Sequence, residues 1–342
     1  MVLPDNNRNN NRILFLDIAK ITVTFLVIYA HLYSTWSVER LYIYSFHMPL
    51  FFIISGMVHK YKGFIQIRKY VKTILIPALF FMALYDIIMI IPFHLGYETK
   101  WSGIERGASI LQSLWNVLID GRNEKITEIR GNNICWFLFA LFWCKVLTDC
   151  IKKKKYLVVF LIICMVFILA WFLHDSIFYL VQGIIALPFY YIGFLYKENI
   201  RRFMTEKRPS LLFLIAMVFL ALNIFLTDIN GRVSILGHIF GNLNVPFNLI
   251  VFYMNAFIGS MCVLCIASIV KMKSSLPQHL ANALISVVGL QYIYIDPYIH
   301  IIGIDQPFII SIFVSIIIFV LCYLGHTIIM HLCPQIFGKN YG

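Results

Sequence analysis

The sequence predicts an all-α membrane protein, a polytopic bundle of about ten transmembrane helices, on three observations. The chain has 342 residues, of which 61% are hydrophobic and only 13% charged, and its mean hydropathy is +0.82. Soluble domains are about 45–50% apolar and about 25% charged. The apolar residues form long continuous runs without alternation, which favours helices over the strands of a barrel. Lysines and arginines gather between alternate runs, as in multi-pass membrane proteins.

Ten apolar runs approach the roughly 20 residues that cross the hydrocarbon layer as a helix. We expect spans at about 14–33, 43–59, 73–93, 133–150, 156–173, 177–196, 210–227, 247–270, 281–302 and 308–332. With the N-terminus in the cytoplasm, about 19 Lys and Arg residues fall in inner segments and about 7 in outer ones. This bias predicts that both chain ends are cytoplasmic, and it explains the net charge of +12 without nucleic acid as a partner.

The segments outside these spans are expected to add no second domain, so residues 1–342 form one membrane domain. The polar tail 1–13 lacks the order and cleavage site of a signal peptide, and the first span is therefore expected to stay as an anchor. In the long external loop 94–131, the amphipathic segment 109–119 is either a helix on the membrane surface or a loop packed on helix ends. The eight cysteines lie mostly within apolar runs, which predicts neither a disulfide framework nor a metal site.

The first span carries a polar stripe on one helical face, which at about 100° per residue consists of Asp17, Lys20, Thr24 and His31. A rise of about 1.5 Å per residue separates Lys20 from His31 by about 16 Å. Ionisable groups inside lipid are costly and indicate function, so this face is expected to line a cavity or to contact other spans. The alternative is a structural Asp17–Lys20 pair at the membrane entrance with an interfacial histidine.

A second histidine, His47, lies in the segment YSFHMPLFFIISG at residues 44–56, near the outer end of the second span. Its predicted depth is similar to that of His31, so the two imidazoles are expected to converge from neighbouring helices. Asp86 and Asp296 are predicted at comparable depth, and a carboxylate beside an imidazole would make it a general base. The spacing leaves open whether either carboxylate faces a histidine.

The third span begins with a basic segment, IRKYVKTILIP, in which Arg68, Lys69 and Lys72 would lie at the cytoplasmic side. Arg68 and Lys72 are i,i+4 neighbours on one helical face. Basic residues near a helix start make a phosphate site. Ordinary anchoring by the positive-inside bias is the alternative.

These motifs resemble the acyltransferase family 3 membrane proteins. The similarity covers nearly the whole chain and lies in LDIAK and VIYAH (16–31), FHMPLFFIISG (46–56), the basic segment with Pro77, WFLFALF (136–142) and, more weakly, LPFYYIGFLY (187–196). Asp and Lys in the first span together with FHMPLFF are most like the branch that modifies cell-surface sugars.

The resemblance implies transfer of an acyl group, usually acetyl, from cytoplasmic acyl-CoA to a hydroxyl of a cell-surface or lipid-linked glycan, in the bacterial plasma membrane. It also implies that Lys20 works with His31, and that Arg68 and Lys72 serve the CoA side. The chain departs from the family pattern in LQYIYID of the ninth span, where Asp296 stands about where relatives have histidine. The sequence does not determine whether the acyl group is acetyl, succinyl or another small acid. It also does not determine which glycan accepts this group.

For the mechanism, we expect the CoA phosphates to stay at the basic inner surface while the pantetheine arm enters the bundle. His31 would take the proton of the acceptor hydroxyl, or alternatively would form an acyl-imidazole. Ser45, His47 and Ser55 are the candidate donors to the oxyanion. The competing class is a glycan exporter or flippase, which predicts paired halves with broken helices that the sequence does not show. A sensor or structural protein would leave the arrangement of His31, His47 and Lys20 unexplained.

Overall fold

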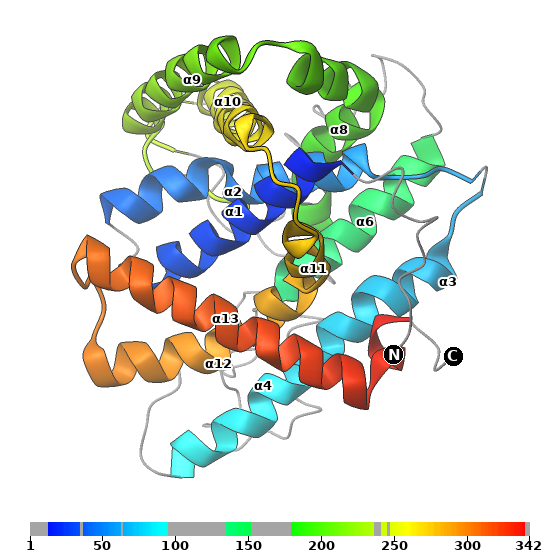
Figure 1. Cartoon of the computed structure of the whole chain (residues 1–342), viewed down its shortest axis with the longest axis vertical. Helices are drawn as coiled ribbons and strands as arrows, with labels where there is room; N and C mark the ends of the chain where they lie inside the picture. Colours follow the sequence, from blue (N-terminus) through cyan, green and yellow to red (C-terminus); the bar gives the residue numbers. More distant parts are fainter. Residues whose placement is uncertain are drawn as a thin grey trace.

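The computed structural model describes residues 13–34, 37–62, 64–94, 135–151, 179–235, 241–244 and 247–338, and these form a bundle of long helices (Figure 1). Within these residues, seven helical segments are long and apolar enough to cross a membrane. The prediction of an all-α, polytopic membrane fold is thereby confirmed. The expected span 156–173 and the amphipathic segment 109–119 lie outside the described residues.

The helices follow in the order α1 (Leu14–His31), α2 (Val38–Met57), α3 (Ile67–Tyr70), the π-helix η2 (Val71–Leu75), α4 (Ile76–His94), α6 (Trp136–Ile151), α8 (Leu180–Glu206), α9 (Pro209–Asn230), α10 (Phe247–Ile269), α11 (Leu276–Asn282), α12 (Leu284–Ile302), α13 (Phe308–Leu332) and the 3₁₀-helix η6 (Pro334–Phe337). α2 and α6 are not among the seven candidate spans. α6 has only 16 residues, and α2 carries charged and polar residues. Seven spans, rather than ten, therefore meet the criteria of length and composition in the described part of the chain.

α2 and α8 extend beyond their expected bounds for local reasons. α2 starts at Val38, five residues before the expected 43, because the side chain of Ser37 accepts a hydrogen bond from the Arg40 amide (3.3 Å) and caps the helix. α8 continues to Glu206, ten residues past the expected end, in a turn rich in charge where Arg202 pairs with Glu206 (3.6 Å).

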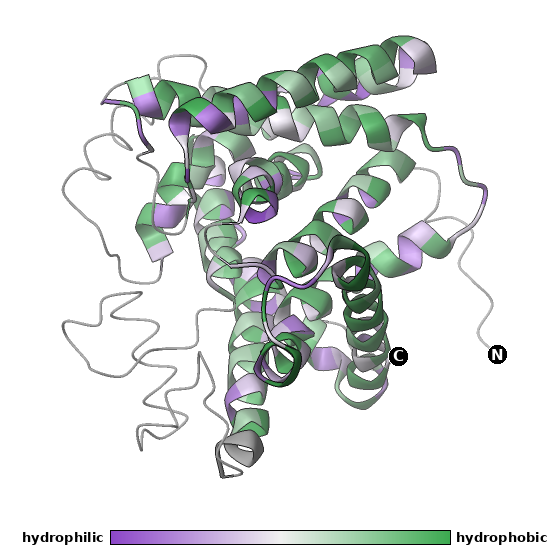
Figure 2. Cartoon of the chain, turned by 90° about the vertical axis from the view of Figure 1, so that its left-hand side faces the viewer, coloured by the Kyte–Doolittle hydropathy of each residue, from purple (hydrophilic) through white to green (hydrophobic). Residues whose placement is uncertain are grey.

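α1 is the central helix of the bundle, in contact with α2, α10, α11, α12 and α13. Figure 1 shows α9 and α10 above α1 and α2, and α4, α12 and α13 below them. The faces of α9 and α13 that carry exposed Leu, Ile, Val and Phe fit contact with lipid, and Figure 2 shows how widely apolar residues cover the helices. The polar stripe of α1 is therefore enclosed by other helices, as expected.

α2 is held tightly against α8 because two glycines let their backbones touch. A Cβ on Gly56 would lie 1.9 Å from the carbonyl oxygen of Tyr190, and one on Gly193 would lie 2.1 Å from that of Ile53. Small residues permit this approach between helices in membranes. The contact fixes the C-terminal half of α2 relative to α8.

The N-terminal half of α2 is fixed by a buried amide network from α9 and α10. The Nδ2 atom of Asn223 donates to Ser45 Oγ (3.0 Å) and Asn255 Oδ1 (2.6 Å), and Asn255 donates to Thr227 (2.8 Å). All four side chains are buried. Hydrogen bonds between helices of this kind contribute about 0.6–2 kcal/mol each in membranes, and here they position the segment of α2 that carries His47.

Candidate functional site

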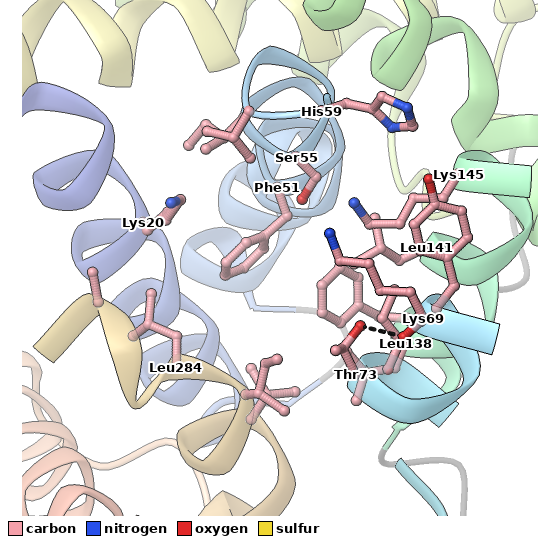
Figure 3. Close-up of a pocket in the computed structure, with 18 of the residues that line it drawn as sticks. Lys20, Phe51, Ser55, His59, Lys69, Thr73, Leu138, Leu141, Lys145 and Leu284 are labelled. Carbon is pink, nitrogen blue, oxygen red and sulfur yellow. Dashed lines mark hydrogen bonds between the residues drawn. The ribbon is translucent and has the colours of Figure 1, made fainter. Parts of the chain in front are cut away.

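A cavity of about 470 Å³ opens between α1, α2, α6, α12 and the segment α3–η2. Its size is typical of sites for small molecules or cofactors. Four lysines line it, namely Lys20, Lys60, Lys69 and Lys145. Figure 3 shows Lys20 of α1 on one side of the cavity, with Lys69 and Lys145 on the other. Lys20 also lies 3.7 Å from Asp17, so the predicted ion pair of the first span forms at the cavity wall.

The wall near α6 contains a buried cluster that the sequence analysis did not single out. The His59 imidazole contacts Asp149 Oδ1 through Nε2 (3.0 Å) and the Tyr190 hydroxyl through Nδ1 (2.6 Å). Tyr70 donates to Asp149 Oδ2 (2.8 Å), and Lys145 donates to the Tyr190 hydroxyl (3.4 Å). Asp149 is therefore bound to side chains of the cavity wall, and it is not one of the residues that line the cavity.

His59 follows the end of α2, and its surroundings lower its pKa. Burial and the nearby ammonium of Lys145 lower the pKa of His59, and they outweigh the opposite effect of Asp149. The sequence could have indicated both residues as candidates, since His59 and Asp149 are ionisable groups at the ends of apolar runs.

His31 lies at the other end of α1, among tyrosines. The hydroxyl of Tyr44 is 3.2 Å from His31 Nδ1, and that of Tyr292 is 3.0 Å from Nδ1 and 3.1 Å from Nε2. Tyr44 lies beside both histidines that were predicted to converge, since its ring centroid is 6.0 Å from that of His31 and 4.6 Å from that of His47. Tyrosines in this position resemble residues of the aromatic belt, which explains why sequence reasoning missed them.

Arg40 orients the Tyr44 hydroxyl. Its Nη2 donates to the Tyr44 oxygen (3.0 Å), its Nη1 donates to the Tyr33 carbonyl (2.9 Å), and its guanidinium lies 4.8 Å from the centre of the Tyr44 ring. Since arginine only donates, the Tyr44 oxygen accepts, and the proton of the hydroxyl is left to point toward His31. The guanidinium also makes this hydroxyl a stronger donor.

His47 is buried with a fixed ring. Its Nδ1 donates to the Ile43 carbonyl (2.9 Å), because a carbonyl oxygen can only accept. The neutral ring therefore carries its lone pair on Nε2. Of the other expected oxyanion donors, Ser45 is engaged, since it donates to the Tyr42 carbonyl (2.7 Å), and Ser55 lines the cavity instead.

One helical turn separates the cavity from the residues around His31. The cavity lining includes Phe51 of α2 and Val288 of α12. His47 precedes Phe51 by four residues, and Tyr292 follows Val288 by four residues. Each pair is therefore about 6 Å apart by helical rise. The cavity thus reaches to within about one helical turn of the residues around His31, and apolar Phe51 and Val288 line it.

The remaining predicted residues fall in different places. Of the basic residues that begin the third span, Lys69 lines the cavity, whereas Arg68 and Lys72 are exposed and are not part of its lining. Asp86 is buried in α4. Asp296 accepts a hydrogen bond from Tyr85, which ties α12 to α4.

Fold and site together define a class, a multi-pass membrane protein with a basic cavity below a histidine that sits among tyrosines. Residues 13–327 match the sequence model of the acyltransferase domain of family 3. The chain belongs to this family and is an acyltransferase. No curated protein and no solved structure matches it significantly.

Proposed function

We propose that this protein transfers an acyl group, most simply acetyl, from acyl-CoA on the cytoplasmic side to a hydroxyl of a cell-surface or lipid-linked glycan on the outer side of the bacterial plasma membrane. One observation carries the proposal: a basic cavity reaches to within one helical turn of the residues that contact His31. Donor and acceptor can then meet inside the bundle while each stays on its own side.

The cavity suits the polyanionic end of acyl-CoA. Lys69 and Lys145 point into it beside each other, and the carboxylate of Asp149 is turned away toward His59 and Tyr70. Ammonium groups in such a site bind phosphate by charge-assisted hydrogen bonds. From the level of Lys20, which lines the same cavity, the thin pantetheine arm has about 16 Å to cover along α1 to reach His31.

In this proposal, His31 acts as the general base. It takes the proton from the acceptor hydroxyl as that oxygen forms a bond to the thioester carbon. The carbon–sulfur bond then breaks, and the thiolate receives the proton from the imidazolium, which yields the ester and free CoA. When substrates are bound, the hydroxyl proton of Tyr44, polarised by Arg40, turns from His31 to the oxyanion and supplies its hydrogen bond in place of the serines expected from the sequence.

The test is acyl transfer by the purified full chain in lipid nanodiscs with labelled acetyl-CoA and candidate glycan acceptors. His31→Ala is expected to abolish transfer while the fold persists, and the matched control His300→Ala, at an exposed histidine of α12, is expected to keep it. Unimpaired transfer by His31→Ala overturns the proposed role. Glycan movement across the bilayer without acyl transfer supports the flippase.

The acyl-imidazole mechanism separates from the general-base mechanism in the same assay. An acyl-imidazole releases CoA and leaves label on the protein before any acceptor is added. A general base does neither, apart from slow hydrolysis. Replacing labelled acetyl-CoA by succinyl-CoA identifies the acyl group.

A further inference from the structure

A second pocket, of about 400 Å³, lies where α1 and α9 begin and α8 and α10 end. We call it the hairpin pocket, because the short turn that joins α8 to α9 borders it. Its lining consists of Ile13, Leu14, Phe15, Arg201, Met204, Thr205, Lys207, Pro209, Leu212, Ser268, Val270 and Lys271. Since helix ends meet here, the pocket lies at the level of the membrane surface.

The rim of the hairpin pocket is positive. Arg201, Lys207 and Lys271 are exposed, and none of them forms an ion pair with a described residue. The nearest carboxylate in sequence to Lys207, that of Glu206, pairs with Arg202 instead. The pocket therefore holds three cations whose charge is left for a ligand.

The start of α9 adds hydrogen-bond donors to this charge. The N-cap residue Arg208 makes no side-chain cap, and Pro209 occupies the first turn. The first amides of this 22-residue helix are thus left without a side-chain acceptor, and the positive end of the helix dipole favours an anion beside them.

The floor and the flank of the pocket are apolar, and this favours a lipid over a soluble anion as the ligand. Phe15, Met204 and Leu212 are buried beneath the rim. From the pocket, the exposed side chains of Leu211, Leu214 and other residues of α9 continue along the lipid-facing surface of the bundle. An anionic head at the rim would therefore have its acyl chains against α9.

We propose that the hairpin pocket binds the headgroup of an anionic phospholipid of the inner leaflet. Basic pockets between transmembrane helices on the cytoplasmic side suit such heads, because phosphate meets Lys and Arg while the chains stay in the bilayer. The site is separate from the cavity that holds Lys20, Lys69 and Lys145, so its occupancy does not depend on the acyl donor.

The test measures lipid binding by native mass spectrometry and thermal unfolding of the full chain, without acyl-CoA, in phosphatidylcholine with or without phosphatidylglycerol. Phosphatidylglycerol is expected to form bound adducts and to raise the Tm of the wild type. The variant Lys207→Ala/Lys271→Ala is expected to bind it about 30-fold more weakly, at about fivefold for each basic contact.

A matched control removes the same charge elsewhere. Lys62→Ala/Lys273→Ala changes two exposed lysines outside the hairpin pocket, and it is expected to bind as the wild type does. Equal binding by both double variants overturns the proposal. A Tm shift by glycerol phosphate or inorganic phosphate as large as that by phosphatidylglycerol also overturns it, since the ligand is then a soluble anion. Unchanged Tm of both variants in pure phosphatidylcholine shows that each is folded.

Discussion

Tyr44→Phe tests the most specific feature of the His31 site. The substitution keeps the ring that packs between His31 and His47 and removes only the hydroxyl that Arg40 polarises. If this hydroxyl stabilises the oxyanion, its loss weakens the transition state but leaves the binding of both substrates nearly unchanged. We expect kcat to fall while both KM values stay within about twofold, as interactions specific to the transition state require.

The magnitude separates two roles for Tyr44. Removal of one oxyanion donor lowers kcat by about 10²–10³-fold. Loss of an ordinary hydrogen bond to His31, 3.2 Å long here, costs about 1 kcal/mol, or about fivefold. The fall in kcat expected for loss of an oxyanion donor is therefore much larger than the fall expected for loss of a hydrogen bond that only orients His31.

The assay is the steady-state transfer of labelled acetyl in nanodiscs, with Tm measured for each variant. Tyr42→Phe is the matched control, since its hydroxyl donates to Asp228 (2.6 Å) at an exposed position two residues away. We expect it to keep nearly full kcat. A Tyr44→Phe enzyme within fivefold of the wild type in kcat would refute the oxyanion role.

Three further predictions concern the cavity and its supports. Lys145→Met should raise the KM for acyl-CoA about tenfold or more, as loss of a charged hydrogen bond does, whereas Lys72→Ala, outside the cavity, should leave that KM unchanged within twofold. Because the pKa of His59 is lowered in the fold, the unfolded chain binds more protons below pH 6.5; Tm should fall as the pH drops through that range, and less so in a His59→Gln variant. Gly56→Ala should destabilise by about 3 kcal/mol or more, because its Cβ meets backbone at 1.9 Å, while Gly325→Ala, which meets only the end of a leucine side chain, should lower Tm far less.

Much of the fold was predictable because hydropathy alone decides which runs can enter lipid. Every expected span within the described residues corresponds to a helix, and α13 has the bounds that the sequence predicts. The number of spans was not predictable in the same way. α6 is short and α2 is polar for membrane-spanning helices. Both are tolerated because they pack mainly against other helices rather than against lipid.

The site was predictable only in part, for a physical reason. Periodicity assigned Asp17 and Lys20 to one face of α1, and they pair as expected. Which loop residue approaches which helix depends on close packing, as at Gly56, and no pattern in the sequence reveals that. The hydrogen bond between His59 and Asp149 could therefore be identified only from the structure, although each residue is an ionisable group beside an apolar run in the sequence.

The apolar lining that Phe51 and Val288 contribute to the cavity has a consequence for the cell. An enzyme that joins a cytoplasmic thioester to an external sugar needs a route through the bilayer, yet an open water-filled route would let protons flow and dissipate the membrane potential. In the proposed reaction the thioester would pass apolar Phe51 and Val288, which line the cavity, before it arrives at His31. Each turnover can then proceed without a continuous column of water, and the barrier function of the membrane survives the chemistry performed within it.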